Sequence, residues 1–254
     1  MKKWMIGAVA LILLGLLAVN GTFASVFDGI FQTVSGIFGN PSPETSENFQ
    51  VENQFLMRNE QRTGLTAIDP NTQLMPAYYA ADFDWQPRPT AIGDEVYSLW
   101  PDEKVSGEFD RFVSVKNVGD GAAYFRTAIA YPDHEEAKKW LYFHLDQAEG
   151  YEWSPWASIT VEGKPYRLIV ATYRERLEPG ESAPVIPVQL AMDSRMENIN
   201  VIFLNGQLDL RVKTMAIAAD NFVRDDENKT PMTALEALDL AVPLPADLSS
   251  YSPF

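Results

Sequence analysis

Apolar and polar residues alternate along the second half of the chain, and this alternation most strongly limits the folds that it can adopt. In residues 122–131 the alternating positions form two sets, one being Ala123, Phe125, Thr127, Ile129 and Tyr131 and the other Tyr124, Arg126 and Ala128. Residues 208–218 repeat the pattern. A period of two is that of an antiparallel strand with one buried face. The sequence therefore predicts a sandwich of antiparallel strands rather than a parallel α/β sheet.

Turn residues separate these runs. Asn205-Gly206 divides residues 198–204 from 208–218, and both residues tolerate positive φ, so a hairpin is expected there. Glu162-Gly163-Lys164 divides 157–161 from 166–173 in the same way. Pro179-Gly180 predicts a turn before a strand over 185–190.

Two helices are expected to interrupt the strands. Asp133 and Glu136 form a capping-box pattern before a helix over 134–148, and Thr230-Pro231 is placed to begin a second helix that runs through Leu240. Residues 243–254 contain three prolines and are expected to form an irregular tail. The predicted fold is mainly β: a jelly-roll-like antiparallel β-sandwich over residues 48–242, with two short helices inserted.

The amino terminus has the pattern of a secretory signal. Lys2-Lys3 precedes an apolar stretch, Trp4–Val19, and small residues lead up to Ala24. We expect residues 1–24 to be a signal peptide cut between Ala24 and Ser25, which predicts a secreted protein of the cell surface or extracellular matrix. The alternative is an uncut membrane anchor, because Trp4–Ala24 approaches the ~20 residues that span a bilayer.

Residues 25–47 form an N-terminal segment and linker with apolar residues at helical spacing. Such a strip either packs on its own domain or is buried in a partner. The candidate self-assembly residues in it are Val26, Phe27, Ile30, Phe31 and Val34. Because helical spacing counts against a strand, a second candidate set lies just downstream: Phe49, Val51 and Phe55.

Composition narrows the possible chemistry. The 35 acidic residues outnumber the 20 basic ones, which gives a net charge of −15 and argues against nucleic acid as a partner. The chain has no cysteine and only two histidines, His134 and His144, so Cys-ligated and three-His metal sites are excluded. The zinc motif H-E-x-x-H would need a histidine where Lys138 stands. We expect no enzyme activity and no cofactor; a secreted hydrolase would have to use one of the two histidines.

Several stretches together resemble the TasA/camelysin family of exported fibre proteins. Residues 115–126 (VKNVGDGAAYFR) are similar to a signature of that family, residues 177–181 (LEPGE) to its turn, and residues 208–222 to its closing strand. Gly21–Asp28 resembles the end of a signal peptide handled by the SipW-type signal peptidase. Within residues 115–126, Asn117–Gly121 predicts a turn between two strands, followed by a solvated Arg126.

The resemblance implies an exported subunit of cell-surface or biofilm-matrix filaments. In such filaments the N-terminal segment of one subunit completes the sheet of its neighbour, a process called donor-strand exchange. The implied partners are further copies of the chain, a SipW-type signal peptidase and a minor fibre-initiating or anchoring subunit. The alternative function is a membrane-anchored surface module that binds carbohydrate or protein.

Overall fold

The structure is a computed structural model that describes residues 50–59, 61, 63–68, 77–79, 85–101, 105–106, 110–133, 139, 141–193, 210–225 and 230–254. All of them belong to Thr45–Phe254, the second of two units into which the chain divides. The expected signal peptide and N-terminal segment lie outside the described residues. Among the described residues, no helix has the length and apolar character required to span a membrane.

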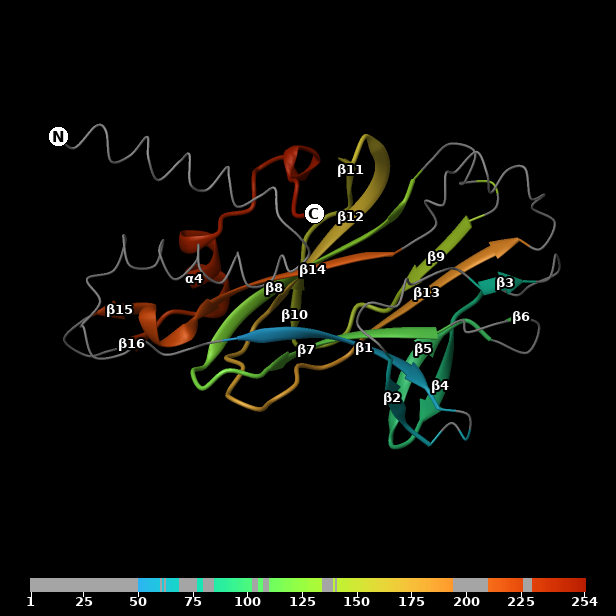
Figure 1. Cartoon of the computed structure of the whole chain (residues 1–254), viewed down its shortest axis with the longest axis horizontal. Helices are drawn as coiled ribbons and strands as arrows, with labels where there is room; N and C mark the ends of the chain where they lie inside the picture. Colours follow the sequence, from blue (N-terminus) through green and yellow to red (C-terminus); the bar gives the residue numbers. More distant parts are fainter. Residues whose placement is uncertain are drawn as a thin grey trace, which may run out of the picture. The chain divides into compact units, whose positions relative to one another are not determined.

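The larger of two main sheets has seven strands (Figure 1). They are β1 (Val51–Arg58), β2 (Leu65–Ala67), β3 (Ala77–Tyr79), β6 (Val105–Ser106), β7 (Asp110–Asn117), β9 (Leu141–Leu145) and β13 (Ile186–Asp193). Their order is β2-β1-β7-β13-β3-β6, with β9 also paired to β13. The β13–β3 pair is parallel, and the other pairs of this sheet are antiparallel.

The second main sheet has five antiparallel strands in the order β10-β12-β8-β14, with β11 also paired to β12. They are β8 (Ala123–Pro132), β10 (Tyr151–Trp153), β11 (Ala157–Val161), β12 (Lys164–Tyr173) and β14 (Arg211–Ala218). The predicted β11–β12 hairpin is confirmed: Glu162 and Gly163 both have positive φ, 51° and 78°, as a tight hairpin turn requires. The Asn205-Gly206 turn lies outside the described residues.

Smaller elements complete the description. Strands β4 (Arg88–Ile92) and β5 (Glu95–Leu99) form a hairpin, and β15 (Val223–Asp225) pairs with β16 (Thr230–Pro231). The described helical elements are α4 (Ala234–Ala241) and two 3₁₀ turns, η2 (Ala219–Asn221) and η3 (Leu248–Ser250).

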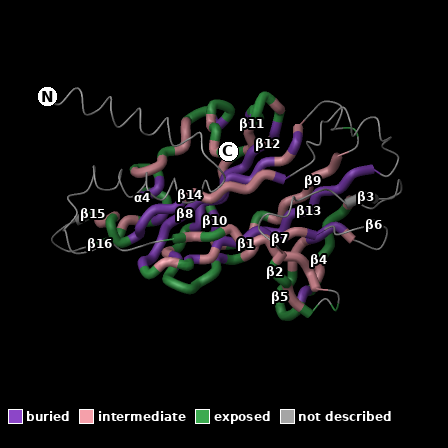
Figure 2. The backbone as a smooth tube through the Cα atoms, viewed as in Figure 1, coloured by how far each residue is buried: buried purple, intermediate pink, exposed green. Residues whose placement is uncertain are grey.

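The two main sheets contact each other through the odd-numbered residues of β8. The ring of Tyr131 stacks on that of Phe143 in β9, with ring centroids 4.2 Å apart. The hydroxyl of Thr127 forms a hydrogen bond with that of Thr214 in β14, and the Thr214 hydroxyl donates to the side-chain oxygen of Asn53 in β1 over 2.6 Å. Buried residues run along β8, β12 and β13 (Figure 2). The predicted mainly β fold of antiparallel sheets is therefore confirmed.

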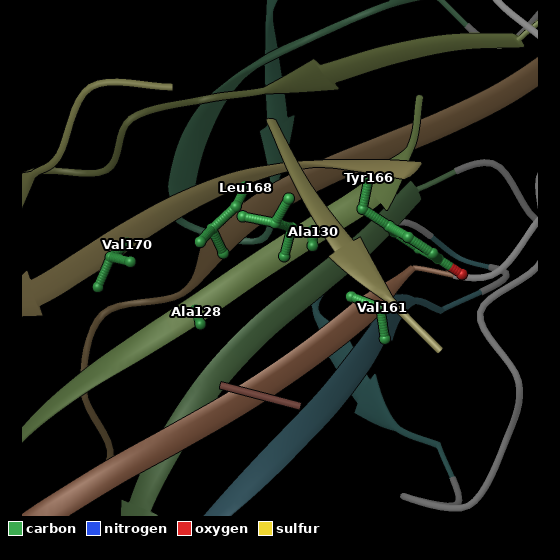
Figure 3. Close-up of a cluster of buried hydrophobic side chains, with 7 residues drawn as sticks. Ala128, Ala130, Val161, Tyr166, Leu168 and Val170 are labelled. Carbon is green, nitrogen blue, oxygen red and sulfur yellow. The ribbon is translucent and has the colours of Figure 1, made fainter. Parts of the chain in front are cut away.

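The even-numbered face of β8 is also buried, so the prediction of one solvated face was wrong. Ala128 and Ala130 belong to an apolar cluster with residues of β11 and β12 (Figure 3). Leu244 and Tyr251 of the predicted tail pack against this cluster, and η3 contains the buried Leu248. The tail is largely irregular, but it forms a cover over the outer face of the five-stranded sheet.

The helix predicted over 134–148 is wrong for residues 141–148: Leu141–Leu145 form strand β9, and the next three residues are not helical. Residues Leu141–Leu145 pair with Val188–Met192 of β13. The strand sends aromatic rings to opposite sides, since Phe143 stacks on Tyr131 and Tyr142 stacks on Trp85. Pairing with β13 therefore outweighs the helical spacing of the apolar residues. Residues 134–138 and Trp140 lie outside the described residues.

The second predicted helix begins later than expected. Thr230-Pro231 forms β16, and α4 begins after Thr233, whose side chain accepts a hydrogen bond from the backbone N–H of Glu236. Glu236 accepts in return from the backbone N–H of Thr233, which completes a capping box. The helix buries Ala234, Ala237 and Leu238.

The cap makes the stability of α4 depend on pH. Hydrogen bonds from Arg224, then from the backbone and hydroxyl of Thr233, lower the pKa of Glu236 to about 2. A lowered folded-state pKa stabilises the fold above the ordinary Glu value, and this contribution is lost as the pH falls from about 4.5 through 2. We expect Glu236→Gln to lower the melting temperature at pH 7 and to leave it unchanged near pH 2. An equal effect at both pH values in thermal denaturation would contradict this assignment.

Gly93 lets the β4–β5 turn approach the loop after β1. Its φ is +63°, and a Cβ at this position would lie 2.7 Å from the backbone oxygen of Thr63. Gly93→Ala is expected to cost about 2 kcal/mol or more in urea denaturation, because it adds this clash to the φ penalty. Gly163→Ala is the matched control: its φ is +78° with no described atom within 4 Å, so only about 1 kcal/mol is expected.

Candidate assembly surface

The resemblance-bearing stretches 115–126 and 177–181 meet at one end of the sandwich. Asn117 is fully buried, and its side-chain amide donates to the carbonyl oxygens of Gly121 (2.8 Å) and Leu177 (2.9 Å). The backbone of Ala123 exchanges two hydrogen bonds with Leu177, and Gly180 donates to the oxygen of Asn117. The predicted turn over Asn117–Gly121 is confirmed, since Asn117 also accepts from the backbone N–H of Gly119.

The third stretch joins them through the end of β14. The N–H of Ala219 donates to the oxygen of Ala122, which continues the β14–β8 ladder into η2. Asp220 forms an ion pair with Arg176, and Arg176 also pairs with Glu178 in the turn. Segments far apart in the sequence therefore form one continuous surface at this end.

Strand β14 lies at the edge of the five-stranded sheet, and in the described part of the chain its backbone bonds to β8 alone. The Ala219–Ala122 bond fixes which residues face β8: the odd-numbered ones, from Arg211 to Ile217. The N–H and C=O groups of the alternate residues therefore point away from the sheet. These residues are Val212, Thr214, Ala216 and Ala218, and none is a proline.

The edge of β5 that faces away from β4 is closed by side chains. The backbone N–H of Ser98 donates to a carboxylate oxygen of Asp146 (2.9 Å). The backbone carbonyl oxygen of Ser98 lies 2.9 Å from His144 Nε2. The buried amide of Gln189 accepts from the N–H of Trp100 (2.6 Å) and donates to the Trp100 carbonyl (3.2 Å). These contacts occupy the backbone groups that another strand would need.

A proline in β4 blocks the opposite edge of the β4–β5 hairpin. Because the backbone of Ser98 points away from β4, its register partner Pro89 also faces outward. Pro89 has no N–H to offer an incoming strand. The chain therefore blocks both edges of this small hairpin, whereas the eight-residue edge of β14 has no such device in the described residues.

Strand β1 is held in its own sheet. Residues Val51–Leu56 pair with Phe112–Asn117 of β7, and Leu56–Arg58 also pair with β2. Arg58 forms an ion pair with Asp110, a buried carboxylate that also accepts from Gln189. Removing β1 would break this pair and leave a buried charge without its cation, which is costly.

The structure describes only two of the assembly residues predicted from the sequence. Val51 and Phe55 lie in β1, partly buried and paired within the chain. The others, together with the expected cleavage residues, lie outside the described part of the structure: Ala24, Ser25, Val26, Phe27, Ile30, Phe31, Val34 and Phe49. The edge of β14 was not predicted, although Pro89 and the proline-free run 211–218 are visible in the sequence.

The structure describes one of the two histidines that were considered for a catalytic role. His144 is half-buried, and its Nε2 bonds the carbonyl of Ser98, while His134 lies outside the described residues. In the described parts of the chain, no three His, Cys, Asp or Glu residues are grouped as metal ligands.

Arg126 was expected to be solvated and is instead fully buried. It donates to the carbonyl of Val242 (3.0 Å) and forms an ion pair with Asp239 (2.8 Å), both contributed by the C-terminal segment. Its role in the described structure is to fasten this segment to β8.

No family model and no curated protein matches the chain.

Proposed function

We propose that the protein is an exported structural subunit of cell-surface or biofilm-matrix filaments that assembles by donor-strand exchange. The outer edge of β14, which bonds to no strand in the described part of the chain, carries this proposal; residues 198–204, the expected hairpin partner of β14, lie outside that part. A donor strand would bond to the outward N–H and C=O groups of Val212, Thr214, Ala216 and Ala218. Contacts that add one copy after another without closing produce a filament.

The donor is the segment before β1, residues 25–49, supplied by a neighbouring copy. The Arg58–Asp110 ion pair and the pairing of β1 with β7 over Val51–Leu56 and with β2 over Leu56–Arg58 favour retention of β1 in its own subunit. The apolar residues between Val26 and Val34 can then pack beside the β14 edge of the neighbouring copy. Export by the N-terminal signal and cleavage before Ser25 would release this segment.

Ala216→Pro is expected to abolish filament growth and leave the subunit folded. The proline removes an outward N–H and no bond to β8, because Ala216 is an outward-facing position. Electron microscopy of purified protein measures the filaments, and circular dichroism checks the fold. The matched control is Ala91→Pro, an outward position on the already blocked edge of β4, which should leave filaments intact.

Normal filaments from folded Ala216→Pro protein would contradict the β14 edge as acceptor. Deleting residues 25–49 should abolish the filaments too. Asn53 and Val115 face each other across β1 and β7, so the double variant Asn53→Cys with Val115→Cys can form a disulfide that locks β1 in its own subunit. This disulfide should leave the filaments intact. Loss of filaments on forming that disulfide, with recovery on reduction, would make β1 the donor. Mass spectrometry of the native N-terminus separates a released subunit, starting at Ser25, from the anchored surface module.

A further inference from the structure

The sulfur of Met215 joins β14 to the C-terminal cover, residues 243–254. The side-chain hydroxyl of Tyr251 donates to Met215 Sδ over 2.8 Å, and Tyr251 also packs against the apolar cluster of the outer face. Burial raises the pKa of the Tyr251 hydroxyl to about 12, although the charge of Arg126 acts in the opposite direction. The hydroxyl therefore keeps its proton at neutral pH, and the sulfur is the acceptor.

Met215 lies on the face of the sheet to which the cover is fastened. The side chain of Thr214 points into the sandwich, where it bonds Asn53, so the side chain of Met215 lies on the outer face of β14. Its register partner in β8 is Arg126, the residue that binds the C-terminal segment. A chemical change at this sulfur therefore acts where the cover meets the sheet.

Met215 is also open to a small oxidant. It is half-buried, whereas Met192 is only 2% exposed. Met57 and Met232 are half-buried too, but in the described part of the chain Met215 is the methionine whose sulfur accepts a hydrogen bond from a side chain. The chain has eight methionines and no cysteine, so thioethers are its only sulfur groups. Met215 thus combines access to solvent with a contact that oxidation would change.

We propose that Met215 is a site of reversible oxidation by hydrogen peroxide, and that formation of its sulfoxide loosens the C-terminal cover. A lone pair of the sulfur attacks one peroxide oxygen, the O–O bond breaks and an S–O bond forms. The other oxygen takes up a proton and leaves as water, so the sulfur loses two electrons and the peroxide gains them. The 2.8 Å contact leaves no room for another atom between Sδ and the Tyr251 hydroxyl. An oxygen on that side displaces the ring, and the sulfoxide is polar whichever way it points.

Peroxide treatment of the purified protein tests the site. Peptide mass spectrometry should show one added oxygen on Met215, and the melting temperature should fall by about 3 °C or more, the shift that ~1 kcal/mol gives in a domain of this size. Met215→Leu keeps the volume of the side chain and cannot form a sulfoxide, so its melting temperature should fall far less. Met57→Leu is the matched control: it removes another half-buried methionine and should lose as much as the parent. Methionine sulfoxide reductases should restore the parent value.

Two further variants separate the hydroxyl contact from the oxidation itself. Tyr251→Phe frees the sulfur lone pair, so Met215 should be oxidised about two- to tenfold faster, the factor that corresponds to a hydrogen bond of ~0.5–1.5 kcal/mol. Met215→Gln places a polar oxygen in the side chain and should lower the melting temperature without peroxide.

Three results would overturn the inference. They are equal falls in melting temperature for the treated parent and treated Met215→Leu, an unchanged melting temperature after Met215 is oxidised, and an unoxidised Met215 in a sample whose Met57 is oxidised. If Met215→Leu does not fold, equal oxidation rates in Tyr251→Phe and the parent would overturn it instead. None of these results bears on strand exchange, because peroxide treatment measures the stability of the single subunit.

Discussion

Arg126→Ala is expected to lower the free energy of unfolding by about 2–5 kcal/mol. The substitution leaves a cavity under α4 and removes the hydrogen bond to the Val242 carbonyl. It also detaches β8 from the segment that covers it. Arg126→Met restores most of the volume without the charge, so a smaller loss is expected from it than from alanine. Urea denaturation followed by tryptophan fluorescence measures both values.

The partner of Arg126 gives a second test of the same contact. Asp239 is 57% exposed, yet Asp239→Ala is expected to cost about 3–5 kcal/mol, because it leaves a fully buried guanidinium without its counter-charge. The control is Arg174→Ala, which removes the exposed pair with Glu152 and should cost at most about 1 kcal/mol. Equal small losses for Asp239→Ala and Arg174→Ala would contradict the anchoring role.

Removing residues 244–254 is expected to destabilise the sandwich by about 5 kcal/mol or to unfold it. Leu244, Leu248 and Tyr251 are lost together, and burial of each such side chain contributes about 1.5–3 kcal/mol. Total stabilities are about 5–15 kcal/mol, so this loss is a large share. Where the shortened protein still folds, it should bind a dye for exposed apolar surface, since the cluster around Ala128 and Leu168 is uncovered.

Two substitutions keep the truncation interpretable. Leu240→Ala removes a side chain of the same region that is 67% exposed, and it should change stability by less than about 0.5 kcal/mol. Tyr251→Phe keeps the ring over the cluster and removes the hydroxyl that contacts Met215, so it isolates the packing from the hydrogen bond. A truncated protein as stable as the parent would show that the C-terminal cover does not stabilise the sheet.

Local patterns predicted the strands whose signals are local. The alternation in 122–131 and the turn at Glu162-Gly163 identified β8 and the β11–β12 hairpin. Burial of the second face of β8 could not be read in this way, because Ala128 and Ala130 suit either environment and the residues that cover them lie more than 100 positions away. The strand β9 was mistaken for a helix because its pairing with β13 joins residues about 45 positions apart.

The candidate assembly surface was only partly predictable. The stretches that carry the resemblance were found in the sequence, but their meeting through Asn117 and Leu177 is a long-range contact. Whether an edge strand is open depends on which strands lie beside it, and no local pattern encodes this. The proline at position 89 is the exception, because an outward proline in a strand already indicates an edge.

The position of the C-terminal cover also has a consequence for biosynthesis. A ribosome makes Ala128 and Leu168 well before it makes Leu244 and Tyr251, the residues that pack over them. The outer surface of the five-stranded sheet therefore stays exposed to solvent until residues 244–251 emerge, and Arg126 stays without its partner until Asp239 has been made. Folding of this sheet is completed only after residues 244–251 have left the ribosome, so the nascent sheet must be shielded from neighbouring chains until then.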